Sequence, residues 1–302
     1  MSLTKGHFFS TLLLLLFLLL ATVTVAQESK TTPAVHGDSI MWMGSATPPF
    51  FIHDGVYKGQ GYVEVINNIL IENLPDYNHT EVEANLSRQN QQWKQGEKAC
   101  SPSKYRTEER KKFLYFSMPS TFSLPIVLII NKNNYSTFGG EKTVNLASIL
   151  QSNKFVIGRI KNRSFGAEFD TILDNYGNDK NIFVYEGPAL LVDLLKMLMA
   201  GRIDAIPGSP EEAMYFAETM GVRDQIMTLN IEENQDDHDS YLGYAACSKN
   251  EWGKTAIDNI NQVLLEQRGT ERYRAAYERW LDPSSIEGYR KKYEEVFLKM
   301  TE

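Results

Sequence analysis

Short β-type stretches alternate with longer helical stretches along most of the chain, and this alternation limits the fold more than any other feature. Between residues 39 and 100 the order is strand, helix, strand, helix, strand, with strands predicted near 39–43, 81–84 and 98–100 and helices over 63–74 and 90–96. A βαβαβ series of this kind predicts a parallel or mixed sheet with helices packed on it. Pro75 is expected to end the first helix.

A second series of the same kind follows after residue 143. Strands are predicted at 155–157, 182–185, 203–206 and 226–229, and helices at 144–150, 164–173, 189–201 and 209–220. Two β-rich stretches, 122–130 and 240–247, separate this series from the rest of the chain, and further helices are expected over 251–267, 270–280 and 287–300. The sequence therefore predicts an α/β protein built from two series of elements.

Length and charge narrow the class of protein further. A chain of 302 residues has the length of one large domain or two of ordinary size. Hydrophobic residues at 42% and charged residues at 23% are typical of a folded protein and exclude a disordered one. The net charge is −7 and no basic block occurs. This charge balance argues against a nucleic-acid partner, because phosphate binding needs clustered positive charge.

The first 26 residues are predicted to be a cleavable secretion signal. Lys5 precedes an uncharged run that contains the apolar segment 12–20, and Thr24 and Ala26 are the small residues expected before a cleavage site. No cysteine stands directly after the apolar segment, so a lipoprotein is not expected. An uncleaved membrane anchor is the alternative, since the uncharged run approaches the length of a span.

Cysteine and histidine are too scattered to predict a metal or cofactor site. The two cysteines, Cys100 and Cys247, cannot form a zinc or iron–sulfur site on their own. In an oxidising compartment they can form a disulfide, whereas two buried free thiols are the other interpretation. The five histidines match neither a metal-binding spacing nor a nucleophile motif, so we expect no metal and no cofactor.

Three stretches of the sequence form a pattern in their order and spacing. They are Pro48-Pro49-Phe50 with Gly59-Gln60-Gly61-Tyr62, then 107–112 with Phe116-Ser117-Met118-Pro119, and finally 261–265 with Gly269-Thr270-Glu271-Arg272-Tyr273 and Arg279-Trp280-Leu281. In these stretches the chain resembles the family 3 extracellular solute-binding proteins, the receptors of polar amino-acid ABC transporters. The likeness covers about residues 39–281. It implies a type 2 periplasmic-binding fold, in which two α/β lobes are joined by two crossing hinge strands and close on a ligand in the cleft.

The resemblance also implies domain limits and partners. Lobe 1 is predicted to comprise residues 27–120 plus 243–302, and lobe 2 residues 121–242, with the hinge at the β-rich stretches 122–130 and 240–247. The implied partners are a small-molecule ligand and an ABC permease of the inner membrane. The expected location is the periplasm and the expected state a monomer. A receptor that reports to a membrane sensor is the alternative to a transport protein.

Arg110 is the strongest candidate for a ligand contact. It matches the arginine with which the family binds a ligand carboxylate, and a guanidinium is always charged and presents paired donors in carboxylate geometry. The alternative is a surface arginine at a helix start that pairs with Glu108 or Glu109.

Further candidates lie where strands give way to loops. For each of them a solvated loop residue is the alternative interpretation. In lobe 1 they follow the first and second strands or precede Arg110, and in lobe 2 they lie near a basic position of the family or at helix starts, where unpaired N–H groups attract anions. These candidates are Ser45, Thr47, Arg88, Tyr105, Arg159, Ser164, Phe165 and Ser209.

The sequence departs from the family at the positions that usually bind an ammonium group. Gly208-Ser209-Pro210 stands where amino-acid binders carry an acid, and Gly44 stands where many members carry another. A buried ammonium without an acceptor is costly. With Arg88, Arg110 and Arg159 in the predicted cleft, these departures favour an anionic ligand. We expect no enzyme, and a cleft enzyme of the cyclohexadienyl dehydratase type is the remaining alternative, for which Glu211, Glu212 and His238 are the acid–base candidates.

Overall fold

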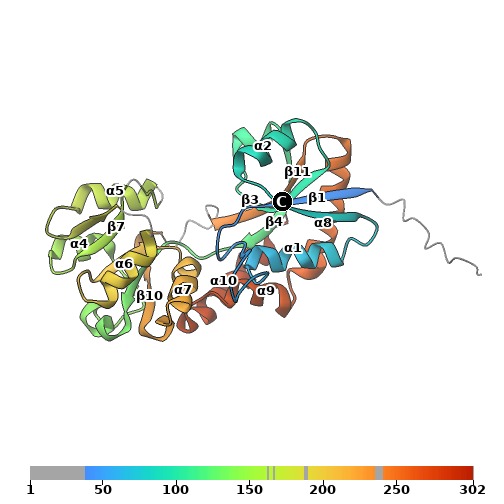
Figure 1. Ribbon diagram of the computed structural model, residues 1–302. Coiled ribbons are helices and arrows are strands. Elements are labelled where there is room, and N and C mark those ends of the chain that lie inside the picture. Colours follow the sequence, from blue (N-terminus) through green and yellow to red (C-terminus); the bar gives the residue numbers. More distant parts are fainter. Residues whose placement is uncertain (1–37, 162, 166, 187–189, 235–240, 302) are drawn as a thin grey trace, which may run out of the picture. The chain divides into compact units, whose positions relative to one another are not determined.

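The computed structural model describes residues 38–161, 163–165, 167–186, 190–234 and 241–301 (Figure 1). The predicted signal sequence, its cleavage site and His238 lie outside these residues. Within the described part of the chain no helix is both long enough and apolar enough to cross a membrane.

The first sheet combines strands from both ends of the chain. Its order is β2 (Asn78–Glu83), β1 (Ser39–Gly44), β3 (Ala99–Lys104), β11 (Leu242–Ser248) and β4 (Leu114–Phe122). The strand β1 runs parallel to both of its neighbours, whereas β11 runs antiparallel to β3 and β4. Figure 1 shows this mixture as the blue β1 and the orange β11 in the same sheet.

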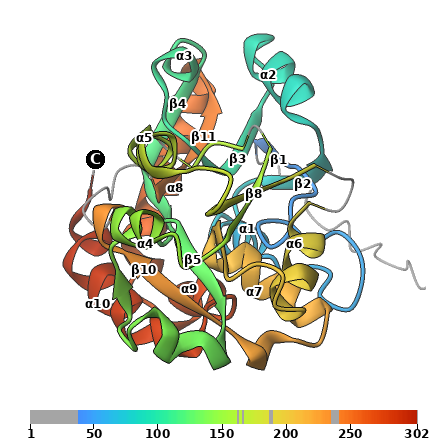
Figure 2. The same ribbon diagram turned by 90° about the vertical axis from the view of Figure 1, so that its left-hand side faces the viewer.

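The second sheet is formed by one continuous part of the chain. Its order is β6 (Thr143–Val144), β10 (Ile226–Ile231), β5 (Val127–Asn131), β9 (Ala205–Gly208), β7 (Ile157–Ile160) and β8 (Ile182–Tyr185). The strands β7, β8 and β9 are parallel, and β5 runs antiparallel to both of its neighbours. The green β5 lies beside the orange β10 in Figure 2.

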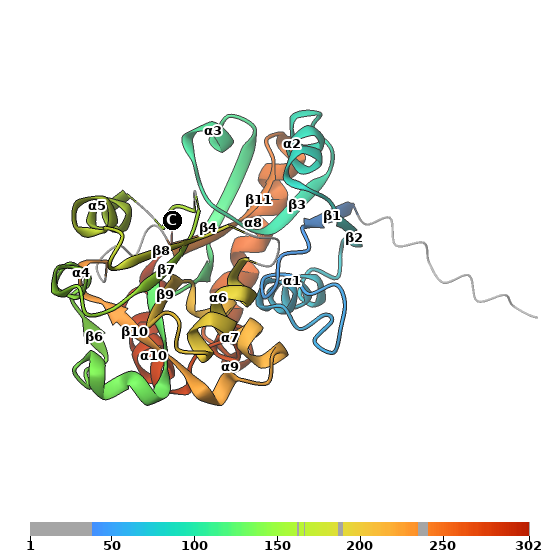
Figure 3. The same ribbon diagram turned by 60° about the vertical axis from the view of Figure 1, so that its left-hand side comes forward.

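Helices follow most strands, as the alternating sequence pattern predicts. The helices connected to the first sheet are α1 (Tyr62–Glu72), α2 (Leu86–Lys94), the short α3 (Glu108–Lys111), α8 (Glu251–Gln267), α9 (Glu271–Glu278) and α10 (Ile286–Glu295). Those connected to the second sheet are α4 (Leu146–Ser152), α5 (Ala167–Tyr176), α6 (Leu190–Met199) and α7 (Pro210–Thr219). Figure 3 shows α6 and α7 as neighbours, in agreement with their contacts.

The central strands β1 and β5 contribute apolar side chains to both faces of their sheets, and strand alternation explains why. In β1 the adjacent Trp42 and Met43 belong to different apolar clusters, because successive side chains of a strand point to opposite faces. In β5 the residues Leu128 and Ile130 lie in one cluster, whereas Val127 and Ile129 lie in the other. Two sheets covered by helices confirm the predicted α/β fold class.

Several predicted limits are wrong by a few residues. The helix expected over 90–96 begins at Leu86, since the Asn85 side chain caps it by accepting from the Arg88 N–H. The helix expected over 287–300 ends at Glu295. The β-rich stretch 122–130 is not one crossing strand: β4 ends at Phe122 and β5 begins at Val127. Pro125 lies in the interval and has no N–H to donate to a ladder.

Two connections join the strands of the first sheet to those of the second, and they are hydrogen-bonded to each other. The Ser123 N–H donates to the Tyr241 carbonyl at 3.0 Å. The Asn234 side-chain amide donates to the Ile126 carbonyl at 2.8 Å. The second predicted crossing stretch, 240–247, is for the most part β11 of the first sheet. The predicted lobe limits at residues 120 and 243 stay a prediction.

The two cysteines form a disulfide inside the first sheet. Cys100 on β3 and Cys247 on β11 are register partners, with their Cα atoms 4.1 Å apart. Both residues are fully buried. The disulfide interpretation is therefore confirmed and the interpretation as two free thiols is wrong.

Candidate functional site

A pocket of about 280 Å³ lies where β1 and β3 end, and it contains four of the predicted site residues, Ser45, Thr47, Tyr105 and Arg110. The remaining walls come from the loop before α1, the first turn of α1, the end of β4 and the beginning of β11. The additional lining residues used below are Phe50, Phe51, Tyr62, Ser103, Lys104, Thr121 and Gly243.

Arg110 is oriented by the chain around it. Thr107 caps the short helix α3, and its hydroxyl accepts from the Arg110 N–H at 3.3 Å. The guanidinium donates from Nη1 to the Tyr105 carbonyl at 2.8 Å. This contact uses one donor and leaves the others for a second partner.

The acids beside Arg110 do not neutralise it. Glu108 pairs with Lys111 at 2.6 Å, and Glu109 pairs with Lys112 at 2.7 Å. The interpretation of Arg110 as a surface residue paired with either glutamate is therefore not what the structure contains. Arg110 instead lines the pocket without an acidic partner among the described residues. Its role in binding stays a prediction.

Lys104 is a second cation in the same pocket, and it was not among the site residues predicted from the sequence. It is the last residue of β3, and its ammonium lies 5.8 Å from the centre of the Trp93 ring. Burial, together with the nearby positive charge of Arg110, lowers the pKa of Lys104 to about 8. Its place at a strand end, like that of Ser45, is the signal that could have identified it.

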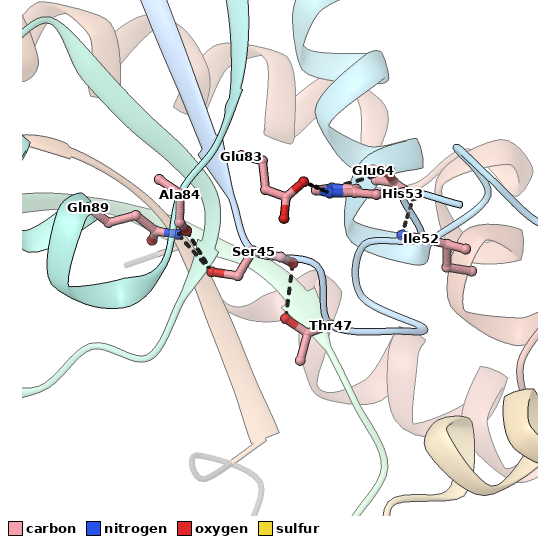
Figure 4. A network of polar contacts seen from close by, with 8 residues as sticks. All are labelled: Ser45, Thr47, Ile52, His53, Glu64, Glu83, Ala84 and Gln89. Atoms are coloured by element: carbon pink, nitrogen blue, oxygen red, sulfur yellow. Dashed lines mark hydrogen bonds and ion pairs between the residues drawn. The ribbon is translucent and has the colours of Figure 1, made fainter. Parts of the chain in front are cut away.

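Ser45 and Thr47 shape the pocket but have little left to donate (Figure 4). The Ser45 hydroxyl donates to the Ala84 carbonyl at 2.8 Å and accepts from the Gln89 side chain at 2.9 Å. The Thr47 hydroxyl donates to the Ser45 carbonyl at 3.0 Å. Since each hydroxyl has one hydrogen, both offer a ligand only acceptor lone pairs. The positively charged donors among the described lining residues are Arg110 and Lys104.

Glycines allow two close approaches in the walls. A Cβ at Gly44 would meet the Phe51 ring at 2.5 Å, so this ring packs directly on the end of β1. A Cβ at Gly243 would overlap the hydroxyls of Ser103 and Thr121, which hydrogen-bond to each other at 2.8 Å. From the sequence, Gly44 is only a position that lacks the acid found in many members of the family. The structure gives it a packing reason.

The remaining predicted residues do not line this pocket. Arg88 is exposed on α2, and Arg159 is half-buried on β7. The Ser164 hydroxyl donates to Asp170, and the Phe165 N–H donates to the same carboxylate at 3.0 Å, so an internal acid occupies the donors that were expected to bind an anion. The Phe165 ring belongs to a core cluster, and Ser209 precedes α7.

The acid–base candidates also lie outside the pocket. Glu211 is 2% exposed and accepts from the Tyr277 hydroxyl at 2.8 Å. Burial is the main reason why the pKa of Glu211 is raised to about 7. Glu212 pairs with Arg163 at 2.6 Å. Neither carboxylate lines the pocket, so neither of these two predicted acid–base candidates lies there.

Solved structures of binding proteins share this fold. One is the substrate-binding protein of a polar amino acid ABC uptake transporter from Streptococcus thermophilus, which is 18% identical, with a TM-score of 0.60 over 85% of this chain and 96% of that chain. Another is the second substrate-binding domain of GlnP from Lactococcus lactis in an open conformation (16% identity, TM-score 0.60, 80% and 94% coverage).

A third solved structure is the probable amino-acid ABC transporter extracellular-binding protein ytmK of Bacillus subtilis (19% identity, TM-score 0.59, 82% and 98% coverage). The sequence matches no family model and no curated protein. Since all three structures are less than 25% identical, the likeness identifies the fold. The chain has the two-lobed α/β fold of periplasmic-type binding proteins.

Proposed function

We propose that this chain is a secreted solute-binding protein that captures a small anionic solute, an amino acid or an organic acid, and delivers it to an ABC permease. The observation that carries the proposal is the charge of the pocket. Arg110 and Lys104 line it, and no aspartate or glutamate is among its described lining residues.

The two cations suit a carboxylate for different reasons. The Arg110 guanidinium can make two parallel hydrogen bonds to one carboxylate, whereas the Lys104 ammonium acts as a compact charge. Two like charges close together in a half-buried pocket are unfavourable, and a bound anion would relieve this repulsion. A ligand ammonium would meet no carboxylate there, which is costly in a buried site.

The walls suit a small solute with an apolar part. The Phe50 and Tyr62 rings lie 4.9 Å apart, and Phe51 lines the pocket beside them. Pockets that bind small molecules typically combine an apolar lining with a few placed polar groups. Aromatic walls around two cations fit that description.

The transport role is supported by the proteins that share the fold. The Streptococcus thermophilus and Bacillus subtilis structures are described as binding proteins of amino-acid ABC transporters, and the latter as extracellular. For this chain we propose the same kind of partner, with export by the predicted signal at residues 1–26, a periplasmic location and a monomeric state. We also propose closure of lobes 27–120 plus 243–302 and 121–242 about the two connections.

A thermal-shift screen tests the proposed ligand class. The mature protein would be heated with matched sets of dicarboxylates, monocarboxylates, zwitterionic amino acids and alkylamines. A ligand that binds only the folded state raises the melting temperature by mass action. We expect carboxylates to raise it and the corresponding amides to leave it unchanged. Stabilisation by amides equal to that by acids would contradict an anionic ligand.

Solution scattering tests closure once a ligand is found. Saturating ligand should reduce the radius of gyration, because closure makes the protein more compact. An unchanged radius at saturation would contradict the closing mechanism and leave the binding role standing.

A further inference from the structure

A second pocket, of about 240 Å³, lies between the carboxyl ends of β1 and β2 and the first turns of α1. It shares the Phe51 ring with the first pocket, but its charge is opposite. Glu64, Glu81 and Glu83 line it together with His53 and Asn67, and no lysine or arginine is among its described lining residues.

Strand register explains why two of these acids converge. Glu81 on β2 lies beside Trp42 on β1, and Glu83 lies beside Gly44. Register neighbours in a sheet share a face. The Trp42 side chain lies in the same core cluster as apolar residues of α1, so this face is the one that α1 covers. The two glutamates therefore lie on the α1 side of β2.

Helix α1 supplies the opposite wall from residues one turn apart. Glu64 uses its Oε2 atom to accept from the Ile52 N–H at 2.8 Å and from the Gly61 N–H at 2.9 Å. Asn67 donates from its amide nitrogen to Glu81 at 2.9 Å. These three hydrogen bonds fix the side chains of Glu64 and Glu81, and the other oxygen of each carboxylate remains as an acceptor.

Among the described lining residues of this pocket, His53 is the one whose side chain can carry a positive charge. Its Nδ1 atom lies 2.7 Å from the Glu83 carboxylate, and its Nε2 atom lies 3.8 Å from Glu64 (Figure 4). A single imidazole cannot neutralise three carboxylates. The pocket therefore keeps an excess of negative charge whether or not His53 is protonated.

Asn67 provides an independent sign that a donor belongs here. The residue is 1% exposed, and its Oδ1 atom is buried without a hydrogen-bond partner. Its amide nitrogen is engaged with Glu81, which fixes the orientation of the amide group. A buried carbonyl oxygen without a partner is unfavourable, and such groups are rare in folded proteins.

We propose that the second pocket binds a small organic ammonium cation. An ammonium group has three N–H donors and no acceptor, which complements a pocket whose free groups are carboxylate oxygens and one amide oxygen. Its alkyl part would lie against Phe51, where an aromatic ring also attracts a cation. Among the residues that the structure describes, no three metal-ligating side chains are grouped to hold a metal ion. The site requires neither the anion nor the permease of the proposed function.

Calorimetric titration with n-butylammonium tests the site, and 1-butanol is the neutral control of the same size. Saturable binding of the amine and none of the alcohol is expected. Glu83→Gln and Glu81→Gln should each weaken the amine by about tenfold, because each removes a charged acceptor while keeping the shape. Glu109→Gln is the matched control, since it makes the same charge change at an exposed position outside the pocket.

Two further outcomes distinguish this site from the first pocket and from a general field effect. Arg110→Ala should leave amine binding unchanged, and tighter binding in that variant would place the amine in the first pocket, because removal of a nearby cation favours a bound ammonium. Equal weakening by Glu109→Gln would mean that net charge alone attracts the amine. Absence of saturable binding by the wild-type protein, shown by circular dichroism to be folded, would overturn the proposal as well.

Discussion

The two sheets differ in whether nearby charged and polar side chains have partners within the protein. At the end of the first sheet, Arg110 and Lys104 line a pocket without an acidic partner among the described residues. Around the second sheet, three polar side chains at the ends of strands or in loops are paired within the protein. Arg163 pairs with Glu212, Ser164 bonds to Asp170, and the Asp204 carboxylate accepts from the Val156 N–H at 2.8 Å.

This difference separates structural from functional charge. A buried or half-buried charge that already has its partners contributes to folding, and a ligand would have to compete for it. A charge held in a pocket without a counter-ion costs stability, and such groups are concentrated at functional sites. We therefore expect ligand recognition at the first sheet and its loops.

Replacement of Arg110 has the largest expected effect. Arg110→Ala should weaken binding of a carboxylate ligand by about 2–5 kcal/mol, since it removes one member of a buried charge pair. Arg110→Lys should restore only part, because an ammonium cannot make the planar two-pronged contact. Calorimetric titration measures both variants. The exposed Arg88→Ala is the control with the same charge change, and affinity within about twofold of wild type for Arg110→Ala would contradict the assignment.

Replacement of Glu211 should change stability rather than binding. The raised pKa of Glu211, about 7 against 4.5, means that the folded state holds its proton more tightly than the unfolded state. Stability should therefore fall as the pH rises from about 4.5 to 7, by about 2–3 kcal/mol. Glu211→Gln cannot ionise and can still accept from Tyr277. It should match wild type near pH 4 and be more stable at pH 8.

Urea unfolding at the two pH values measures this difference. Glu212→Gln is the matched control, because that carboxylate is paired with Arg163 and should give no gain at pH 8. If Glu211→Gln also gives no gain, burial does not destabilise the ionised carboxylate of Glu211 as its raised pKa predicts.

The fold could be predicted from the sequence where local signals are strong. The helix over 251–267 and the strand over 182–185 have the predicted limits, since capping residues and apolar runs define them locally. The start of helix α2 was predicted four residues too late, at residue 90 instead of Leu86. This helix is mostly polar and buries only Gln89 and Trp93, so it shows little apolar periodicity.

The site could be predicted only in part, because pocket residues meet through tertiary contacts. Four lining residues were predicted, from the motif around Arg110 and from the expectation that ligand contacts lie where strands give way to loops. Lys104 was not predicted, because its lowered pKa depends on burial and on the nearby charge of Arg110, and its ring contact is with Trp93. Neither contact can be recognised from the sequence around Lys104. Ser164 and Phe165 were predicted from a helix start, and the sequence pattern did not reveal that Asp170 binds that turn.

The pH dependence of anion binding tests Lys104, with a smaller effect. The pKa of Lys104 is lowered to about 8, and a bound anion favours the protonated form. Affinity should therefore be constant at lower pH and fall by about tenfold between pH 7 and 9, as the free protein loses this proton. Lys104→Met should be weaker at pH 7 and nearly independent of pH over that range. The exposed Lys132→Met is the control, and the same pH profile in Lys104→Met and wild type would show that another group titrates.

The smallest effect is expected at Arg159, where the two sheets are compared directly. Arg159 is half-buried on β7 and does not line the first pocket, so Arg159→Ala should change the affinity by no more than about twofold, the range typical of exposed charges. Ser209→Ala should behave in the same way, because Ser209 precedes α7 and also lies outside that pocket. Both variants would be titrated beside Arg110→Ala with the same ligand. A loss at Arg159 as large as that at Arg110 would mean that the second sheet contributes a ligand contact on closure, and recognition would then be shared between the two sheets.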